Sequence, residues 1–139
     1  MASLLDMTQE RHVHIEQRLR AEKIVWLISG RPDGRPHAVP VGFVWDGESF
    51  WLFSRPNNQK IKNIRANANV LLAVDNTHLG SDPITIEGTA TLLATESANR
   101  TLSIYAEKYS GGLKAQGLTR ESLAVQYSQC IRITPTRVV

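Results

Sequence analysis

The stretch that decides the fold is residues 35–75, which read RPHAVPVGFVWDGESFWLFSRPNNQKIKNIRANANVLLAVD. Near its middle, Asp46 and Gly47 separate two runs rich in aromatic and β-branched residues, and an Asp-Gly pair in that setting predicts a tight β-hairpin. Pro56 then interrupts the pattern, and Asn58 is suited to the start of a helix. The stretch therefore predicts two strands, one short helix and a third strand in VLLAVD.

The predicted short helix carries an apolar stripe and a charged edge. Ile61 and Ile64 lie three residues apart and would pack inward, whereas Lys60 and Lys62 place positive charge beside the first turn. A helix start offers unpaired N–H groups and the positive end of the helix dipole, so cations there suit a phosphate or a carboxylate. The residues predict a candidate anion site at Lys60. A solvated helix face whose lysines bind nothing is an equally open interpretation.

The strand before the hairpin is predicted to have one bulky face and one nearly bare face. Because side chains alternate along a strand, Val39 and Phe43 share the bulky face, and Ala38, Pro40 and Gly42 share the other. Gly in a strand often marks the close approach of a ligand, so a flat ring could lie on the bare strip. The alternative, which the residues favour, is that Pro40 marks an edge strand and that Gly42 makes room for a neighbouring side chain.

The rest of the chain predicts a mainly β protein with satellite helices. Six strands joined mostly by hairpins favour one small antiparallel barrel, which also removes exposed strand edges. We expect a single domain over residues 1–139, with an N-terminal helix within 1–22 and the barrel over 23–139. Further strands are predicted over residues 23–29, 84–93 and 129–134, with a bulge at Gly88. Thr8 is predicted to cap the N-terminal helix, and a second helix runs from Thr95 and ends before a loop at Gly111-Gly112 that could act as a lid. A third helix is predicted from a cap at Thr119 to Tyr127.

The amino-acid composition and the absence of common motifs limit the kinds of function to expect. A net charge of +3 permits anionic ligands but does not require nucleic acid, which we rank last as a partner. The single cysteine, Cys130, excludes a disulfide within one chain and is expected to be a buried, inert thiol. No long apolar run and no secretory signal are found, so we expect a cytoplasmic protein without a membrane partner. No P-loop, GxGxxG, GxSxG or HExxH motif occurs, so in an enzyme a bound cofactor would carry the chemistry.

Several motifs together point to one family. The run GRPHAVPVGFVWDGESFWLFSRP at 34–56, then K-x-x-N-I-R-x-N-x-x-V from Lys60, IEGTATL from Ile86 and the closing Y-S-x-x-I-R-I-x-P-T-R from Tyr127 resemble the pyridoxamine 5'-phosphate oxidase-like split-barrel family of flavin and deazaflavin enzymes. The similarity extends over nearly the whole chain. It is closest to the short subgroup labelled as probable enzymes dependent on coenzyme F-420, an 8-hydroxy-5-deazaflavin.

The resemblance implies a six-stranded antiparallel split barrel like that of FMN-binding proteins, and a homodimer with the cofactor site at the interface. It implies an oxidoreductase that binds FMN or coenzyme F-420, with the deazaflavin favoured, and transfers a hydride to or from a small organic substrate. The residues that it assigns to the cofactor are Pro40, Val41, Gly42 and Phe43 for the ring, Ser54 as a hydroxyl, and Arg55, Asn58, Gln59, Lys60 and Asn63 around the phosphate.

Two departures from the family pattern narrow the activity. Enzymes that oxidise pyridoxamine phosphate carry an Arg-Lys pair at the phosphate where this chain has Gln59-Lys60, and their C-terminal substrate motif with Arg and His is lacking. We therefore do not expect true pyridoxamine phosphate oxidase activity. Losing one phosphate cation also weakens the case for FMN. No catalytic residue or metal site can be assigned, and a non-catalytic flavin-binding protein for storage or sensing is the alternative function.

Overall fold

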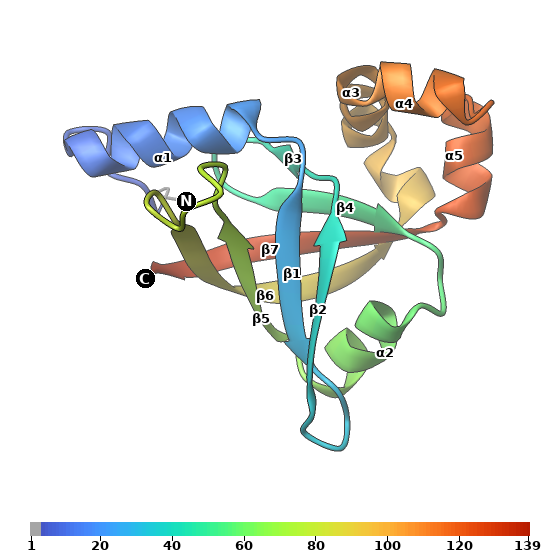
Figure 1. Cartoon of the computed structure of the whole chain (residues 1–139). Coiled ribbons are helices and arrows are strands. Elements are labelled where there is room, and N and C mark those ends of the chain that lie inside the picture. Colours follow the sequence, from blue (N-terminus) through green and yellow to red (C-terminus); the bar gives the residue numbers. More distant parts are fainter. Residues whose placement is uncertain (1–3) are drawn as a thin grey trace.

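The computed structural model describes residues 4–139, which form one seven-stranded sheet with helices around it (Figure 1). The strands are β1 (Val25–Gly30), β2 (Pro36–Val41), β3 (Val44–Trp45), β4 (Phe50–Ser54), β5 (Asn69–Val74), β6 (Ile84–Ala94) and β7 (Gln129–Val138). The helices are α1 (Glu10–Ala21), α2 (Gln59–Ala66), the 3-10 turn η1 (Thr95–Ala98), α3 (Asn99–Lys108), α4 (Ser110–Ala115) and α5 (Arg120–Gln126). Every pair of neighbouring strands is antiparallel, in the order β2-β1-β5-β6-β7-β4-β3.

The sheet curls into a split barrel. Its two edge strands, β2 and β3, are consecutive in the chain and are joined by only Gly42 and Phe43, so the two edges must lie close together at that point. Helix α1 covers one end of the barrel, α2 lies near the opposite end, and α3 to α5 form a separate group beside the ends of β4 and β7 (Figure 1). The predicted mainly β, antiparallel architecture is confirmed.

The structure has seven strands where six were predicted, because the expected strand before the hairpin is interrupted. At the interruption, the N–H of Phe43 donates to the Tyr109 hydroxyl at 2.8 Å, and its carbonyl accepts from Lys108 Nζ at 2.7 Å. Side chains from the end of α3 thus replace strand partners at Phe43. The two predicted halves become β2 and β3.

Two buried clusters hold the molecule together. Inside the barrel, Leu27, Phe43 and Phe50 are completely buried, together with Leu52, Ile131 and Ile133. Between the barrel and the α3–α5 group, Leu102, Leu123 and Cys130 form a second cluster. Burial raises the pKa of the Cys130 thiol to about 11, so the expected buried, unreactive cysteine is confirmed.

Of three local features, a strand bulge and two helix caps, two lie where the sequence predicted them. The register between β6 and β7 shifts at Glu87/Gly88, which confirms the bulge, and a Cβ on Gly88 would come within 2.7 Å of Ile133 Cγ2. Thr119 caps α5 in a capping box with Ser122. The predicted cap at Thr8 is wrong, because the Thr8 hydroxyl donates to the Asp6 carboxylate and α1 starts two residues later.

The expected loop at Gly111-Gly112 is also wrong, since both glycines lie inside α4. The helix instead ends at Gly117, whose φ of +70° only glycine adopts easily. The Gly117 N–H donates to the Lys114 carbonyl and the Leu118 N–H to the Leu113 carbonyl, which is a Schellman motif. Leu113 packs on the second buried cluster, so tertiary contact outweighs the poor helix propensity of the glycines.

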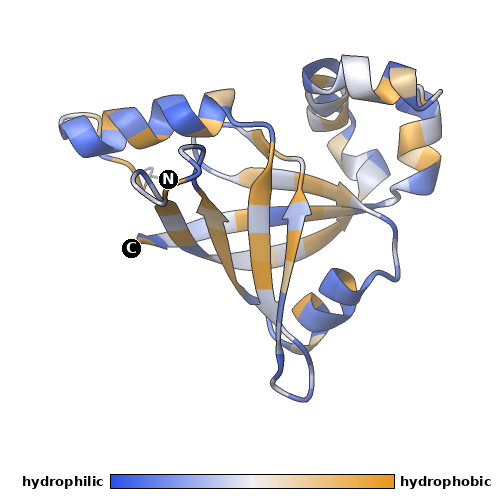
Figure 2. Ribbon diagram, in the orientation of Figure 1, coloured by the Kyte–Doolittle hydropathy of each residue, from blue (hydrophilic) through white to orange (hydrophobic). Residues whose placement is uncertain are grey.

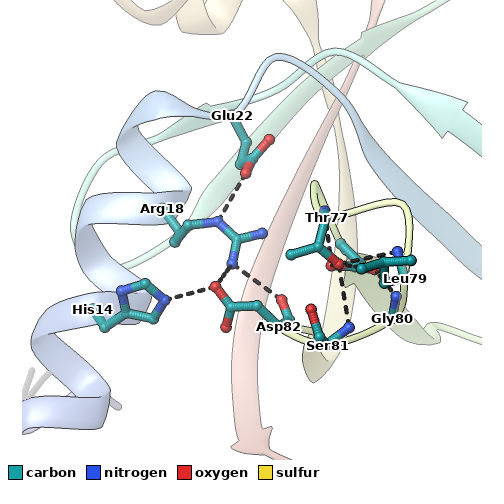
Figure 3. A network of polar contacts seen from close by, with 9 residues as sticks. His14, Arg18, Glu22, Thr77, Leu79, Gly80, Ser81 and Asp82 are labelled. Carbon is teal, nitrogen blue, oxygen red and sulfur yellow. Dashed lines mark hydrogen bonds and ion pairs between the residues drawn. The ribbon is translucent and has the colours of Figure 1, made fainter.

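Helix α1 is fixed to the loop between β5 and β6 by a charged network (Figure 3). Arg18 is buried, with 8% of the residue exposed; its Nε binds Glu22 at 2.8 Å and its Nη1 binds Asp82. His14 Nε2 lies 2.8 Å from the same Asp82 carboxylate. In Figure 2, most residues of α1 are coloured as hydrophilic and much of β1 as hydrophobic. Because β1 has both faces apolar, its outer face leaves apolar side chains uncovered.

Candidate functional site

Two positive side chains, Lys60 and Arg31, lie near the imidazole of His37 where α2 faces the β1–β2 turn. Lys60 is half-buried in the first turn of α2, and burial lowers its pKa. His37 is also half-buried, and its pKa is lowered mainly by burial and further by the charges of Arg31 and Lys60. The Nη1 of Arg31 donates a 2.8 Å hydrogen bond to the carbonyl of Pro36, the residue before His37. These residues, Arg31, His37 and Lys60, form what we call the cationic cluster.

The cationic cluster has an unused hydrogen-bonding atom. His37 Nδ1 is buried and has no partner within the part of the chain that the structure describes. A buried ring nitrogen without a partner costs free energy, which a bound polar ligand would recover. The predicted anion site at Lys60 therefore gains two side chains. No sequence pattern groups Arg31 and His37 with Lys60, because α2 comes near them only in the folded protein.

The other predicted residues of α2 play mixed parts. Asn63 is completely buried; its Nδ2 donates to Ser29 Oγ at 3.0 Å, and its Oδ1 accepts from Gln59 Nε2 at 2.8 Å. Asn63 and Gln59 thus fasten α2 to β1. Asn58 stands at the N-cap position, but its side chain makes no capping bond. Its polar atoms and the free N–H groups of the first helical turn lie at the same end of α2 as Lys60.

Ser54 and Arg55 make their contacts outside the cationic cluster. Ser54 is buried, and its hydroxyl donates to the carbonyl of Arg55 at 2.8 Å. The Arg55 side chain extends to α5, where Nη2 lies 3.4 Å from Gln126 Oε1 and the guanidinium stacks 5.3 Å from the Tyr127 ring centre. In this arrangement Arg55 contacts the helical group and does not supply a second cation next to Lys60.

The bare strip of β2 is exposed over most of its length. Ala38 and Pro40 are exposed, whereas Val39 and Val41 turn inward and pack on the barrel core. β2 is an edge strand, as one interpretation of Pro40 expected. The strip ends at Gly42, where a Cβ atom would lie 2.8 Å from the Tyr105 hydroxyl, so this glycine does make room for neighbouring side chains.

A cavity of about 230 Å³ adjoins the end of the strip, between the α3–α5 group and the barrel. Gly42 is part of its wall, and three tyrosines, Tyr105, Tyr109 and Tyr127, also line it. No sequence pattern indicates this cavity, because its walls come from segments far apart in the chain. Beside it, Lys108 is half-buried near Lys23, and burial lowers the pKa of Lys108 to about 8.

A wider groove of about 560 Å³ crosses the outer face of β1, β5 and β6. Its lining includes Ile28, Leu71 and Thr85. Next to it on β1, Trp26 is 48% exposed, although it pairs with Pro40 on one side and Ala73 on the other. An apolar sheet face of this kind is typical of a surface that another molecule covers.

Comparison with known proteins places the chain in a family. The family described as "Pyridoxamine 5'-phosphate oxidase" matches residues 12–139, and the chain belongs to it. No curated protein sequence matches the chain. Among the described residues, no helix is long and apolar enough to cross a membrane, and no three His, Cys, Asp or Glu side chains are grouped as metal ligands.

Solved structures share the fold. An F420 reductase is 23% identical with a TM-score of 0.73, and the match covers 89% of this chain and 94% of that one. The heme storage protein HutZ from Vibrio cholerae is 17% identical with a TM-score of 0.72, covering 93% and 92%. A FAD-binding protein from Mesorhizobium loti is 20% identical with a TM-score of 0.67, covering 91% and 90%. The split-barrel fold is thus common to proteins whose names carry different cofactors.

Proposed function

We propose that this protein is an oxidoreductase that binds FMN or the deazaflavin coenzyme F-420 and transfers a hydride to or from a small organic substrate. The observation that carries the proposal is the cationic cluster at one end of an exposed, small-residue strip. His37 precedes the strip on the opposite face of β2, and from Ala38 to Gly42 the strip extends about 13 Å at the rise of an extended strand. That length suits a phosphate at the cluster and a flat ring system farther along β2.

The residues present fit such a cofactor. Lys60 and Arg31 would balance the phosphate charge, and the orphaned Nδ1 of His37 would gain a polar partner. Ala38 and Pro40 leave room for a ring to lie flat against the strand. When bound, a reduced flavin or deazaflavin supplies the hydride, and the protein's part is to hold the ring and exclude water from one face. The neighbour named as an F420 reductase supports the deazaflavin, and the FAD-binding neighbour supports a flavin.

The proposal includes a homodimer with the cofactor at its interface. The uncovered apolar face at Trp26, Ile28 and Leu71 supports a second copy of this chain as the partner. That face adjoins β2, so a partner placed there would cover the outer side of the strip and shield a bound ring from water.

The test is a fluorescence titration of the purified protein with FMN and, separately, with coenzyme F-420. Replacing Lys60 by Ala should weaken binding of the preferred cofactor about 10- to 100-fold, since a charge-assisted bond to phosphate is lost. Lys62→Ala removes an exposed lysine from the same helix and should change affinity less than about threefold. If both variants bind as the native protein does, the phosphate site is elsewhere. If neither cofactor binds, the proposal fails.

A non-catalytic storage or sensing role is the second candidate, and the heme storage protein among the structural neighbours favours it. The two candidates differ in turnover. Hydride transfer from the reduced cofactor to any acceptor in a broad panel would exclude a purely binding role. Tight cofactor binding without transfer to any of them would favour it.

A further inference from the structure

The cavity beside Gly42 has the size and lining of a small-molecule site. Its volume of about 230 Å³ is close to the space that a two-ring organic molecule of about ten carbon atoms fills, roughly 200 Å³ at protein packing density. None of the residues that line it carries a charge, and Ile24, Leu113 and Leu123 make its walls apolar. The occupant should therefore be uncharged and mainly apolar.

The tyrosine hydroxyls around the cavity differ in what they bind. The Tyr109 hydroxyl accepts from the Phe43 N–H and lies 2.8 Å from the Lys23 carbonyl and 3.0 Å from the Phe43 carbonyl, so its bonding capacity is used within the fold. The Tyr105 hydroxyl has no hydrogen-bond partner among residues 4–139, although it reaches Gly42 at the cavity wall. Tyr105 thus offers a free O–H donor inside an apolar cavity.

The Tyr105 ring is held in place by its neighbours. Its centre lies 5.1 Å from the Phe53 ring in an edge-on contact and 4.6 Å from the Tyr109 ring. Burial raises the pKa of Tyr105 well above its ordinary value, so the hydroxyl keeps its proton at neutral pH. A fixed donor of this kind selects a ligand with an acceptor atom and discriminates against the same skeleton without it.

We propose that the cavity binds the flat, uncharged ring of a small carbonyl compound, with the Tyr105 hydroxyl donating a hydrogen bond to the carbonyl oxygen. The inference that such a compound binds depends only on the cavity and on the free Tyr105 donor. That this ligand is the substrate rests on the proposed function, because only then does Gly42 lie between the ligand and a cofactor along β2.

The test uses two probes of one skeleton, 1-tetralone and tetralin, which lacks the carbonyl oxygen. Each is titrated into the protein without cofactor, and binding is followed by NMR chemical shifts. The native protein should bind 1-tetralone more tightly than tetralin. Tyr105→Phe should weaken 1-tetralone about 3- to 10-fold and leave tetralin within twofold, as expected for one neutral hydrogen bond. Equal effects on both probes, no effect on either, or no binding to the native protein would overturn the proposal.

A second pair of variants locates the probes. Gly112 lines the cavity and Gly111 does not, and a Cβ on either would meet no atom within 4 Å, so larger side chains fit at both positions. Gly112→Leu should reduce binding of both probes at least tenfold by filling the cavity, whereas Gly111→Leu should leave it unchanged. Matching losses in the two variants would place the probes elsewhere. Since cofactor is absent throughout, these results stand apart from the FMN and F-420 titrations, and either proposal can fail alone.

Discussion

A single hydroxyl group, that of Tyr109, binds the backbone where the strand predicted before the hairpin is interrupted. It serves the N–H and carbonyl of Phe43 and the carbonyl of Lys23, which have no strand partner there. Tyr109→Phe should lower the free energy of unfolding by about 1–3 kcal/mol, because a backbone N–H loses its acceptor. Tyr105→Phe, which removes an unbonded hydroxyl, should cost less than about 0.5 kcal/mol. Urea unfolding of both variants measures the difference, and equal losses would contradict this role of Tyr109.

Lys108 should make stability depend on pH. Its folded pKa of about 8 lies below the ordinary 10.5, so between these values the unfolded chain holds more protons and stability rises with pH. The native protein should therefore gain stability relative to Lys108→Met as the pH is raised from 7.5 to 9.5. Chemical unfolding at several pH values gives this difference, with Lys114→Met as the control at an exposed lysine. A constant difference over that range would rule out the depressed pKa.

At this scale the sequence predicted the local part of the site only. Lys60 could be found because its helix start, stripe and charge all lie within a few residues. Tyr109 meets Phe43 across 66 residues, and Lys60 lies near His37 only because α2 packs beside the β1–β2 turn, so no spacing rule could reveal these contacts. The cofactor assignments of Pro40 to Phe43 and of Ser54 came from the family resemblance and stay predictions until a cofactor is bound.

Among the elements, α4 shows how packing changes the meaning of glycine. Gly117 ends the helix at a φ of +70°, whereas Gly111 lies within it in ordinary helical conformation with open space around its Cα. Gly117→Ala should destabilise the protein by about 1–2 kcal/mol, and Gly111→Ala should stabilise it by about 0.5–1 kcal/mol. Thermal unfolding of the pair tests this, and opposite signs are required. A gain from Gly117→Ala would show that the helix ends differently.

The elements themselves were predicted where the signal is local. The Asp46-Gly47 hairpin, the bulge at Gly88 and the cap at Thr119 depend on residues within one turn or one strand. The extent of α4 and the split of the strand before the hairpin depend on what packs against them. Prediction from propensity alone therefore gave a loop where the structure has α4, and one strand where it has β2 and β3.

For the whole molecule, the uncovered face of β1 predicts association. Trp26→Glu should convert a dimer to a monomer, because a charge would be buried against the partner's apolar surface. Leu79→Glu is the matched control, since Leu79 is 86% exposed in the β5–β6 loop and does not line the groove on that face. Sedimentation velocity at micromolar concentration distinguishes the two species. A native protein that sediments as a monomer would remove the homodimer from the proposal.

The link between the two edge strands of the barrel limits how the neighbouring helices can move. Gly42 and Phe43 join the two edges of the sheet, and the bonds that hold Phe43 come from Tyr109 and Lys108 at the end of α3. Helix α3 cannot move away from the barrel to enlarge the cavity unless the hydrogen bonds from Tyr109 and Lys108 to Phe43 break. We therefore expect a ligand that displaces α3 to shift Phe43 as well, and with it the end of the strip at Gly42.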